Sequence, residues 1–252
     1  MTPLGAWRRR PGEPPRIYGH RGVRGPLPEN TMAAFERAAA EGADGIELDV
    51  RVCGSGELVV FHDPELTRMT GESDRRLVAD VGHDELARLD LGGGAGVPRL
   101  SEVLAWARGR RLRVNVEVKG DVADRLAAAR RTARLVGLVP DAPDFVMVSS
   151  FYPQILAMLA GLGCPAPLAF LFHAGQARQR PWLVGRALGC SSLHPERVLT
   201  PPESVQAARA AGRVVNVWTV NDASEARDLA AIGVDGLITD RPGEIGAAVR
   251  GA

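Results

Sequence analysis

Lysine is almost absent from this sequence. Of 31 basic residues, only Lys119 is a lysine, and the others are all arginine. An excess of charge of either sign is missing too, because 30 acidic residues bring the formal net charge to +1. A chain this close to neutrality has no general electrostatic attraction for nucleic acid or for an anionic membrane. We therefore expect neither as a partner, and an anionic ligand has to be bound by a local site.

Long apolar runs and closely spaced cysteines are also missing. Residues 1–15 contain four prolines and three consecutive arginines, which predicts a flexible N-terminal arm and not a secretory signal. No later segment reaches the length of a membrane span, so we expect a cytoplasmic protein without a stable membrane anchor. The three cysteines are widely spaced and form no metal-binding pattern, which indicates reduced thiols. Nothing in the composition specifies an oligomeric state.

From residue 16 onwards, short β-rich apolar runs alternate with alanine-rich helical stretches. Strands are expected at 16–20, 45–52, 111–119, 144–150, 167–172, 190–194, 213–220 and 234–240. Helices are expected at 30–41, 101–109, 122–137, 153–162, 175–188, 202–211, 222–232 and 242–249. Such alternation is typical of parallel strands joined by helical crossovers, and eight strands in 252 residues indicate a (β/α)₈ TIM barrel. We expect residues 16–252 to form one domain.

The apolar run at 57–63 does not fit this alternation. It follows the second strand after only the residues CGSG, whereas a parallel crossover needs about a dozen residues. We therefore expect a hairpin arm that returns beside the second strand. This arm would deliver His62 to the C-terminal mouth of the barrel, where the active sites of such barrels lie. Residues 64–99 contain turn signals and no barrel strand, so they are predicted to form a small mouth-side insertion.

Polar side chains share one face on two neighbouring strands. Strand alternation places Glu47 and Asp49 inside the barrel, and it puts Glu117 and Lys119 in a second inward row. Three ionised carboxylates crowded in a barrel mouth would repel one another and lose their hydration. One lysine cannot balance them, so we predict one bound divalent cation. Ligation by carboxylate oxygens favours Ca²⁺ or Mg²⁺.

Two histidines and an arginine are expected at the same mouth. The first strand ends in GHRG (19–22), which places His20 and Arg21 there. Arginine offers a planar fork of donors suited to phosphate oxygens, and histidine titrates near neutral pH. With His62 returned by the hairpin, one imidazole would act as general base and the other as general acid. Arg21, Lys119 and the metal would stabilise the charge that develops on a phosphate.

Several ordered motifs resemble those of the glycerophosphodiester phosphodiesterase family: GHRG…PENTMAAF, IELDVRV…GELVVFHD, VNVEVKG, VSSF and VNVWTVND…GVDGLITDRP. The resemblance extends from about Arg16 to Ile245. It implies a metal-dependent TIM barrel of lipid and glycerol metabolism that hydrolyses small-molecule glycerophosphodiesters to glycerol 3-phosphate and an alcohol. By motif, the resemblance assigns roles to eight residues: His20 and His62 as the acid/base pair, Arg21 as the phosphate-contacting arginine, Glu47, Asp49 and Glu117 as metal ligands, Lys119 beside phosphate and metal, and Trp218 against the glycerol.

The roles of several individual residues stay open at this point. Trp218 is suited to substrate contact or to core packing, and His194 to lining the cavity or to a structural role. Asp63 is as well placed to cap the following turn as to orient His62. Two further interpretations make Asn30 a helix N-cap and His83 a surface or loop residue.

Three other functions are compatible with the same residues. They are phospholipase D-like cleavage of lysophospholipids, a lyase with a Schiff base on Lys119, and a non-catalytic phosphodiester-binding barrel. The intact histidines and carboxylates favour hydrolysis, and the lack of an apolar lid or amphipathic anchor in the sequence favours water-soluble substrates. We expect Lys119 to act as a compact point charge, where a broad guanidinium would crowd the metal or the phosphate.

Overall fold

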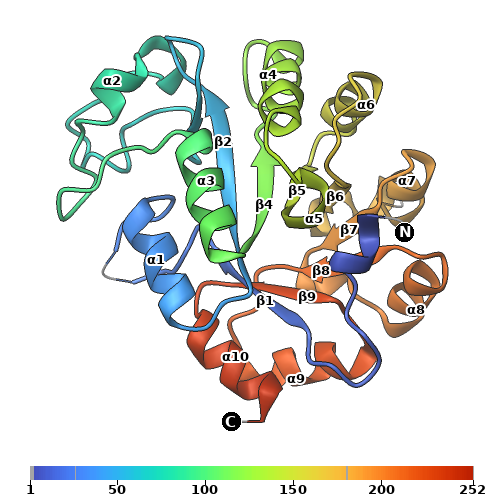
Figure 1. The fold of residues 1–252 in the computed structure, drawn as a ribbon. Coiled ribbons are helices and arrows are strands. Elements are labelled where there is room, and N and C mark those ends of the chain that lie inside the picture. The colour runs from blue at the N-terminus through green and yellow to red at the C-terminus, as the bar shows by residue number, and fades with distance from the viewer. Residues whose placement is uncertain (1–2, 26, 180, 252) are drawn as a thin grey trace.

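The computed structural model describes residues 3–25, 27–179 and 181–251, and these residues form a closed barrel surrounded by helices (Figure 1). Its eight parallel strands are β1 (Arg16–His20), β2 (Gly45–Val52), β4 (Arg113–Val118), β5 (Val146–Ser150), β6 (Leu168–Phe172), β7 (Ser192–Pro195), β8 (Val214–Val217) and β9 (Gly236–Thr239). Parallel pairing of β1 with both β2 and β9 closes the sheet. The TIM barrel predicted from the sequence is confirmed.

Helices pack around the outside of the strands. The main ones are α1 (Met32–Ala40), α3 (Leu100–Arg110), α4 (Arg125–Gly137), α6 (Pro153–Gly161), α7 (Pro181–Ala187), α8 (Pro202–Ala210), α9 (Ala223–Ile232) and α10 (Pro242–Arg250). Short helical segments are α2 (His83–Leu86), α5 (Ala142–Phe145) and the 3₁₀ turns η1 (Pro3–Ala6), η2 (Val78–Asp80), η3 (Ala174–Gln179) and η4 (Arg197–Leu199). None of the helices described combines the length and the apolar character needed to cross a bilayer.

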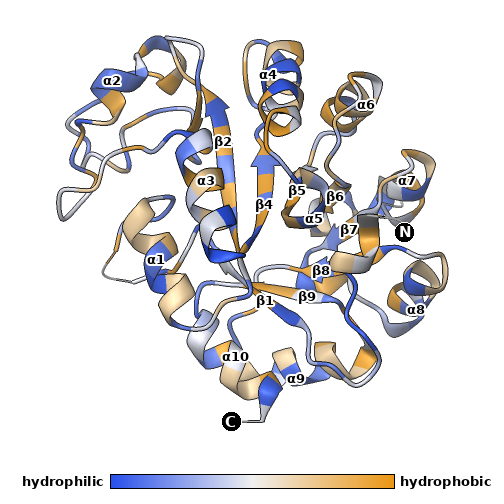
Figure 2. Ribbon diagram, in the orientation of Figure 1, coloured by the Kyte–Doolittle hydropathy of each residue, from blue (hydrophilic) through white to orange (hydrophobic). Residues whose placement is uncertain are grey.

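Alternation along the strands separates the apolar helix layer from the polar interior. Figure 2 shows apolar and polar residues in successive bands along β2 and β4. Ile46, Leu48 and Val50 of β2 are at most 1% exposed and belong to the large apolar cluster under the helices. Burial of each such side chain stabilises the fold by about 1.5–3 kcal/mol. This burial fixes the register, because a slip by one residue would turn these aliphatic side chains inward and Glu47 and Asp49 outward.

Strand register aligns the inward polar residues in levels across the barrel. In the parallel pairing of β2 with β4, Asp49 lies opposite Glu117. In the pairing of β1 with β2, His20 lies opposite Glu47. His20 is the last residue of β1 and Glu117 the last but one of β4. Because β2 continues past the mouth into the hairpin, its carboxylates lie at the same level, and the barrel mouth receives the carboxylates and the histidine together.

The expected hairpin arm is present in a shorter form, as β3 (Leu58–Val60), which pairs antiparallel with β2. Gly56 in the connecting turn has φ +88°, a left-handed conformation that glycine adopts without steric cost. Beyond β3, the chain forms a lobe that projects from the end of β2 and contains α2 (Figure 1). This lobe has its own apolar core, formed by Cys53, Val59, Phe61, Leu66, Val78, Val81, Leu86, Leu91 and Val97.

Two expectations outside the barrel are wrong. The N-terminal segment is not a loose arm, because Trp7 is 1% exposed, packs with Tyr18 and Met147 and donates from Nε1 to the Pro143 carbonyl at 2.9 Å. These contacts close the end of the barrel opposite the mouth; Met1 and Thr2 lie outside the described residues. His83 is neither a surface nor a loop residue, because it begins α2 and its side chain is buried in the lobe.

Candidate active site

A cavity of about 150 Å³ opens at the C-terminal mouth of the barrel. It is lined by His20, Arg21, Glu47, His62, Glu117, Lys119, Phe151, Leu171, Trp218 and Ile238. Seven of the eight site residues expected from the sequence are in this lining. The eighth, Asp49, is 1% exposed and contacts Arg21 and Lys119. The fold therefore brings the whole expected set together.

The three carboxylates form a compact buried cluster. Glu47, Asp49 and Glu117 each offer an oxygen within 4.8 Å of the other two, a grouping that could hold a metal ion. Burial, reinforced by the negative charge of Asp49, raises the pKa of Glu47 to about 8. Burial also raises the pKa of Glu117, despite the neighbouring Lys119. The pKa of Asp49 is held well below its usual range, because Lys119 and Arg21 outweigh the effect of its burial.

Two cations contact this cluster. Lys119 Nζ donates to Glu117 Oε1 at 2.7 Å and to Asp49 Oδ1 at 3.3 Å. Arg21 Nε lies 3.1 Å from Asp49 Oδ2, and the Arg21 backbone N–H donates to Glu47 Oε2 at 3.1 Å. Although burial opposes it, the two carboxylates raise the pKa of Lys119 above its usual value. A Schiff-base lysine needs a depressed pKa, so this environment argues against the lyase alternative.

His20 is oriented by a partner from the far end of the chain. Its Nδ1 lies 2.7 Å from Asp240 Oδ1, and the other oxygen of Asp240 accepts from Asn221 Nδ2 at 2.7 Å. Burial alone would lower the pKa of His20, but the hydrogen bond to Asp240 and the charge of Glu47 raise it above its usual value. With Nδ1 held by Asp240, Nε2 is the ring nitrogen left for chemistry.

His62 has an equivalent arrangement built from local residues. Its Nδ1 lies 2.6 Å from Asp63 Oδ1, and Arg68 Nε donates to Asp63 Oδ2 at 2.5 Å. The buried Arg51 donates from Nε to the His62 carbonyl at 2.8 Å and pairs with Asp121 at 2.8 Å. Asp63 therefore orients His62 and does not serve as a turn cap.

Aromatic side chains form one wall of the cavity. Trp218 donates from Nε1 to the His194 carbonyl at 2.9 Å, and Phe151 packs edge-on against Trp218 with ring centroids 5.3 Å apart. His194 itself is completely buried, and its Nε2 accepts from Asn216 Nδ2 at 3.0 Å. Burial lowers the pKa of His194 to about 3, so it stays neutral and supports the wall from behind.

Sequence reasoning missed two supports of the site. Asn30 is not the helix cap, since Thr31 caps α1 with its side-chain oxygen. Asn30 instead donates from Nδ2 to Asp49 Oδ2 at 2.9 Å, with a left-handed backbone at φ +58°. Asp240 was part of a recognised motif at the end of the last strand, but it received no role. Its position at a strand's C-terminal end was the signal that could have identified it.

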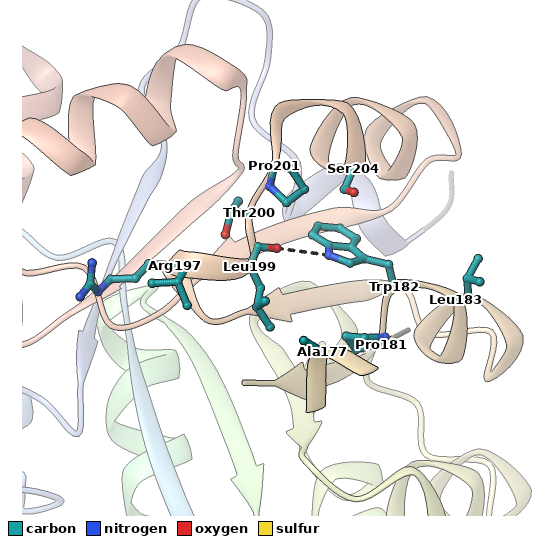
Figure 3. Close-up of a pocket in the computed structure, with 10 residues that line it drawn as sticks. Ala177, Pro181, Trp182, Leu183, Arg197, Leu199, Thr200, Pro201 and Ser204 are labelled. Atoms are coloured by element: carbon teal, nitrogen blue, oxygen red, sulfur yellow. Dashed lines mark hydrogen bonds between the residues drawn. The ribbon is translucent and has the colours of Figure 1, made fainter. Parts of the chain in front are cut away.

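A larger groove of about 700 Å³ lies between α7 and the η4–α8 segment (Figure 3). Its lining residues are Ala177, Pro181, Trp182, Leu183, Arg197, Val198, Leu199, Thr200, Pro201 and Ser204. Trp182 crosses it and donates from Nε1 to the Leu199 carbonyl at 3.2 Å. Because this lining contains no carboxylate, histidine or cysteine, the smaller mouth cavity is the chemically equipped one.

Comparison with known proteins decides the family. The model of the glycerophosphoryl diester phosphodiesterase family matches residues 20–244. The chain belongs to this family. A glycerophosphodiester phosphodiesterase of Bacillus altitudinis is 33% identical over 237 residues, which cover 90% of this chain and 95% of that protein. This membership makes the chain an enzyme of the glycerophosphodiester phosphodiesterase class, as its motifs indicated.

Solved structures with this barrel agree over nearly the whole chain. A crystal structure from Silicibacter pomeroyi DSS-3 has a TM-score of 0.88 at 26% identity and covers 99% of this chain and 97% of that one. A phosphodiesterase from Oleispira antarctica, in complex with the product sn-glycerol-3-phosphate, has a TM-score of 0.81 at 27% identity and covers 94% and 97%. The glycerophosphodiester phosphodiesterase barrel is thus shared without large additions or deletions.

Proposed function

We propose that this chain hydrolyses glycerophosphodiesters to glycerol 3-phosphate and an alcohol, with His20 and His62 as its acid/base pair. The observation that carries the proposal is the pairing of each imidazole with an aspartate through Nδ1, at 2.7 Å for His20 and 2.6 Å for His62, in one cavity with an acidic cluster. Family membership and the product complex of the Oleispira antarctica protein support the substrate class.

A divalent cation, Ca²⁺ or Mg²⁺, fits the donor set of this cavity. Glu47, Asp49 and Glu117 supply only oxygen, the ligand type that these hard ions prefer. Burial and the charge of Asp49 raise the pKa of Glu47 to about 8 in the protein alone, so the ionised form of Glu47 is not fully stabilised by the cations nearby. When bound, the ion would polarise phosphate oxygens and neutralise these carboxylates.

Each histidine is suited to move a proton at Nε2. A carboxylate on Nδ1 holds the ring in one orientation and one tautomer, and it stabilises the imidazolium that forms when Nε2 takes a proton. In the mechanism that we propose, the neighbouring glycerol hydroxyl attacks phosphorus and the alcohol leaves. The resulting cyclic phosphate is then opened by water. His20 and His62 exchange the roles of acid and base between the two steps.

The remaining cavity residues hold the substrate. Arg21 and Lys119 place positive charge where the phosphate would lie. Their stabilisation of the phosphate increases as negative charge develops on its oxygens in the transition state. Trp218 and Phe151, which line the cavity, offer apolar contact for the carbon skeleton of glycerol. A cavity of about 150 Å³ suits a small polar substrate. We also propose a cytoplasmic location, as the sequence led us to expect.

Release of glycerol 3-phosphate tests the proposal. Glycerophosphocholine, glycerophosphoethanolamine, glycerophosphoglycerol and a lysophospholipid are each assayed with Mg²⁺, with Ca²⁺ and with chelator. We expect turnover of the first three with metal and loss of turnover with chelator. The variants His20→Ala and His62→Ala should each lower kcat by about 10²–10⁴-fold, the usual contribution of general acid/base catalysis. Chelator-insensitive turnover, or near-normal rates in both variants, would contradict the mechanism.

A further inference from the structure

Side chains of alternating charge link His62 to the acidic cluster at the barrel mouth. The chain of contacts runs from His62 to Asp63 (2.6 Å), to Arg68 (2.5 Å), to Glu29 (2.6 Å), to Arg21 (3.0 Å) and to Asp49 (3.1 Å). Arg68 lies between Asp63 and Glu29 in this chain of contacts, and it comes from the lobe after β3. One end of this chain of contacts is His62, a catalytic imidazole of the proposed mechanism, and the other is Asp49, a member of the acidic cluster.

Fold stability does not account for this arrangement. The Arg68 side chain is 49% exposed, and ion pairs with this much exposure contribute only about 0–1 kcal/mol to stability. The lobe is held by its own apolar core, in which Leu66 and Leu86 are fully buried. The geometry of Arg68 is specific nonetheless, since its Nε and Nη2 engage two different carboxylates at once, Asp63 and Glu29.

We propose that Arg68 is a positioning residue, which fixes Asp63 against His62 and ties this pair to Glu29 and Arg21. This inference rests on the proposed function of His62. Asp63 uses one oxygen for His62 and the other for Arg68, so its carboxylate is held at both ends. Without Arg68 the carboxylate turns freely toward solvent, and the His62 ring loses its fixed orientation. The planar guanidinium suits this double contact, whereas an ammonium is a single point charge.

Arg76 provides a matched control in the same lobe. It is 48% exposed and also pairs with two carboxylates, Asp74 at 2.6 Å and Glu85 at 2.7 Å, but it lies outside the chain of contacts. We expect Arg68→Met to lower kcat by about 10- to 100-fold with KM changed less than about threefold, because Arg21 keeps its contact with Asp49. Arg76→Met should leave kcat within about twofold of the original chain, and both variants should melt at nearly the same temperature.

A double-mutant cycle asks whether Arg68 acts through Asp63. If it does, Arg68→Met costs much less activity in an Asp63→Asn background than in the original chain. Arg68→Lys should recover only part of the loss, since lysine cannot span both carboxylates. Equal kcat values for Arg68→Met and Arg76→Met, or fully additive effects with Asp63→Asn, would overturn the inference.

The low-field NMR resonance of the His62 Nδ1 proton gives a readout independent of turnover. It is assigned by its loss in His62→Ala, and we expect it to disappear or shift in Arg68→Met while it persists in Arg76→Met. An unchanged resonance in Arg68→Met would overturn the inference. Normal turnover in His62→Ala would instead overturn the proposed function, and the resonance would then decide the positioning role by itself.

Discussion

Replacement of the single lysine by arginine tests how the site distinguishes two cations of equal charge. Lys119 Nζ is 2.7 Å from Glu117 Oε1 and 3.3 Å from Asp49 Oδ1, in a side chain that is 12% exposed. At an effective dielectric constant of about 20, each such contact is worth roughly 5 kcal/mol before the cost of desolvation is subtracted. Lys119→Arg keeps this attraction, so we expect its melting temperature to stay within about 3 °C of the original chain.

The cost of Lys119→Arg should fall on catalysis. A guanidinium adds two non-hydrogen atoms in a plane, and it must share a cavity of about 150 Å³ with a phosphate and a cation. Overfilling a packed site costs about 1–3 kcal/mol, which corresponds to a loss of about 5- to 150-fold in kcat/KM if it falls on the transition state. The assay is kcat/KM for glycerophosphocholine at saturating metal, with release of glycerol 3-phosphate measured. Full activity in Lys119→Arg would refute the steric reasoning.

Two companion variants separate charge from size. Lys119→Met removes the charge and leaves two buried carboxylates facing each other, so we expect the free energy of unfolding in chelator to fall by about 2–4 kcal/mol. The same change should tighten cation binding in calorimetry, because a competing positive charge is gone. Arg113→Lys, a converse exchange far from the mouth at the residue that donates to the Ala6 carbonyl at 2.8 Å, should leave kcat/KM unchanged.

Two further predictions concern pH. Asp240 raises the pKa of His20, so Asp240→Asn should lower kcat and move the limb of the kcat/KM profile that His20 controls to lower pH. The raised pKa of Glu47 means that the folded metal-free protein holds a proton that the unfolded chain releases near pH 4.5. Its contribution to stability is therefore lost as pH rises from about 4.5 to about 8, and Glu47→Gln should remove that part of the pH dependence in chelator melts. If the free energy of unfolding of the original chain instead increased with pH relative to that of Glu47→Gln, Glu47 would be ionised when buried.

The barrel and the inward rows were predictable because they follow from short-range rules. Strand periodicity alone places Glu47 and Asp49 on one face and Ile46 and Leu48 on the other, and no tertiary contact has to be known. The hairpin that delivers His62 was predictable from connection length in the same way. Each of these inferences uses residues that are close together in the sequence.

The positions of Asn30 and Trp7 required knowledge of three-dimensional contacts. Asparagine is a residue type that is common at helix N-caps, but Asn30 has a left-handed backbone, and its side chain contacts Asp49. Trp7 sits in a proline- and arginine-rich segment that looks disordered, yet it finds a buried position beside Tyr18. In both cases a long-range contact outweighs the local preference of the residue, and such contacts cannot be read from a single sequence.

Closure of the barrel is itself a condition for catalysis in the proposed mechanism. His20 ends β1, and its partner Asp240 lies 220 residues later, directly after β9. Their 2.7 Å contact forms only when β1 pairs with β9, whereas the contact of His62 with Asp63 needs only adjacent residues. Weakening the β1–β9 seam, for example by Leu237→Ala at the residue that pairs with Ile17, should therefore reduce the part of catalysis that depends on His20 before it affects His62. A low-field proton resonance lost from His20 but retained by His62 in that variant would be the expected sign, and simultaneous loss of both would show that the two histidines are ordered by one common event.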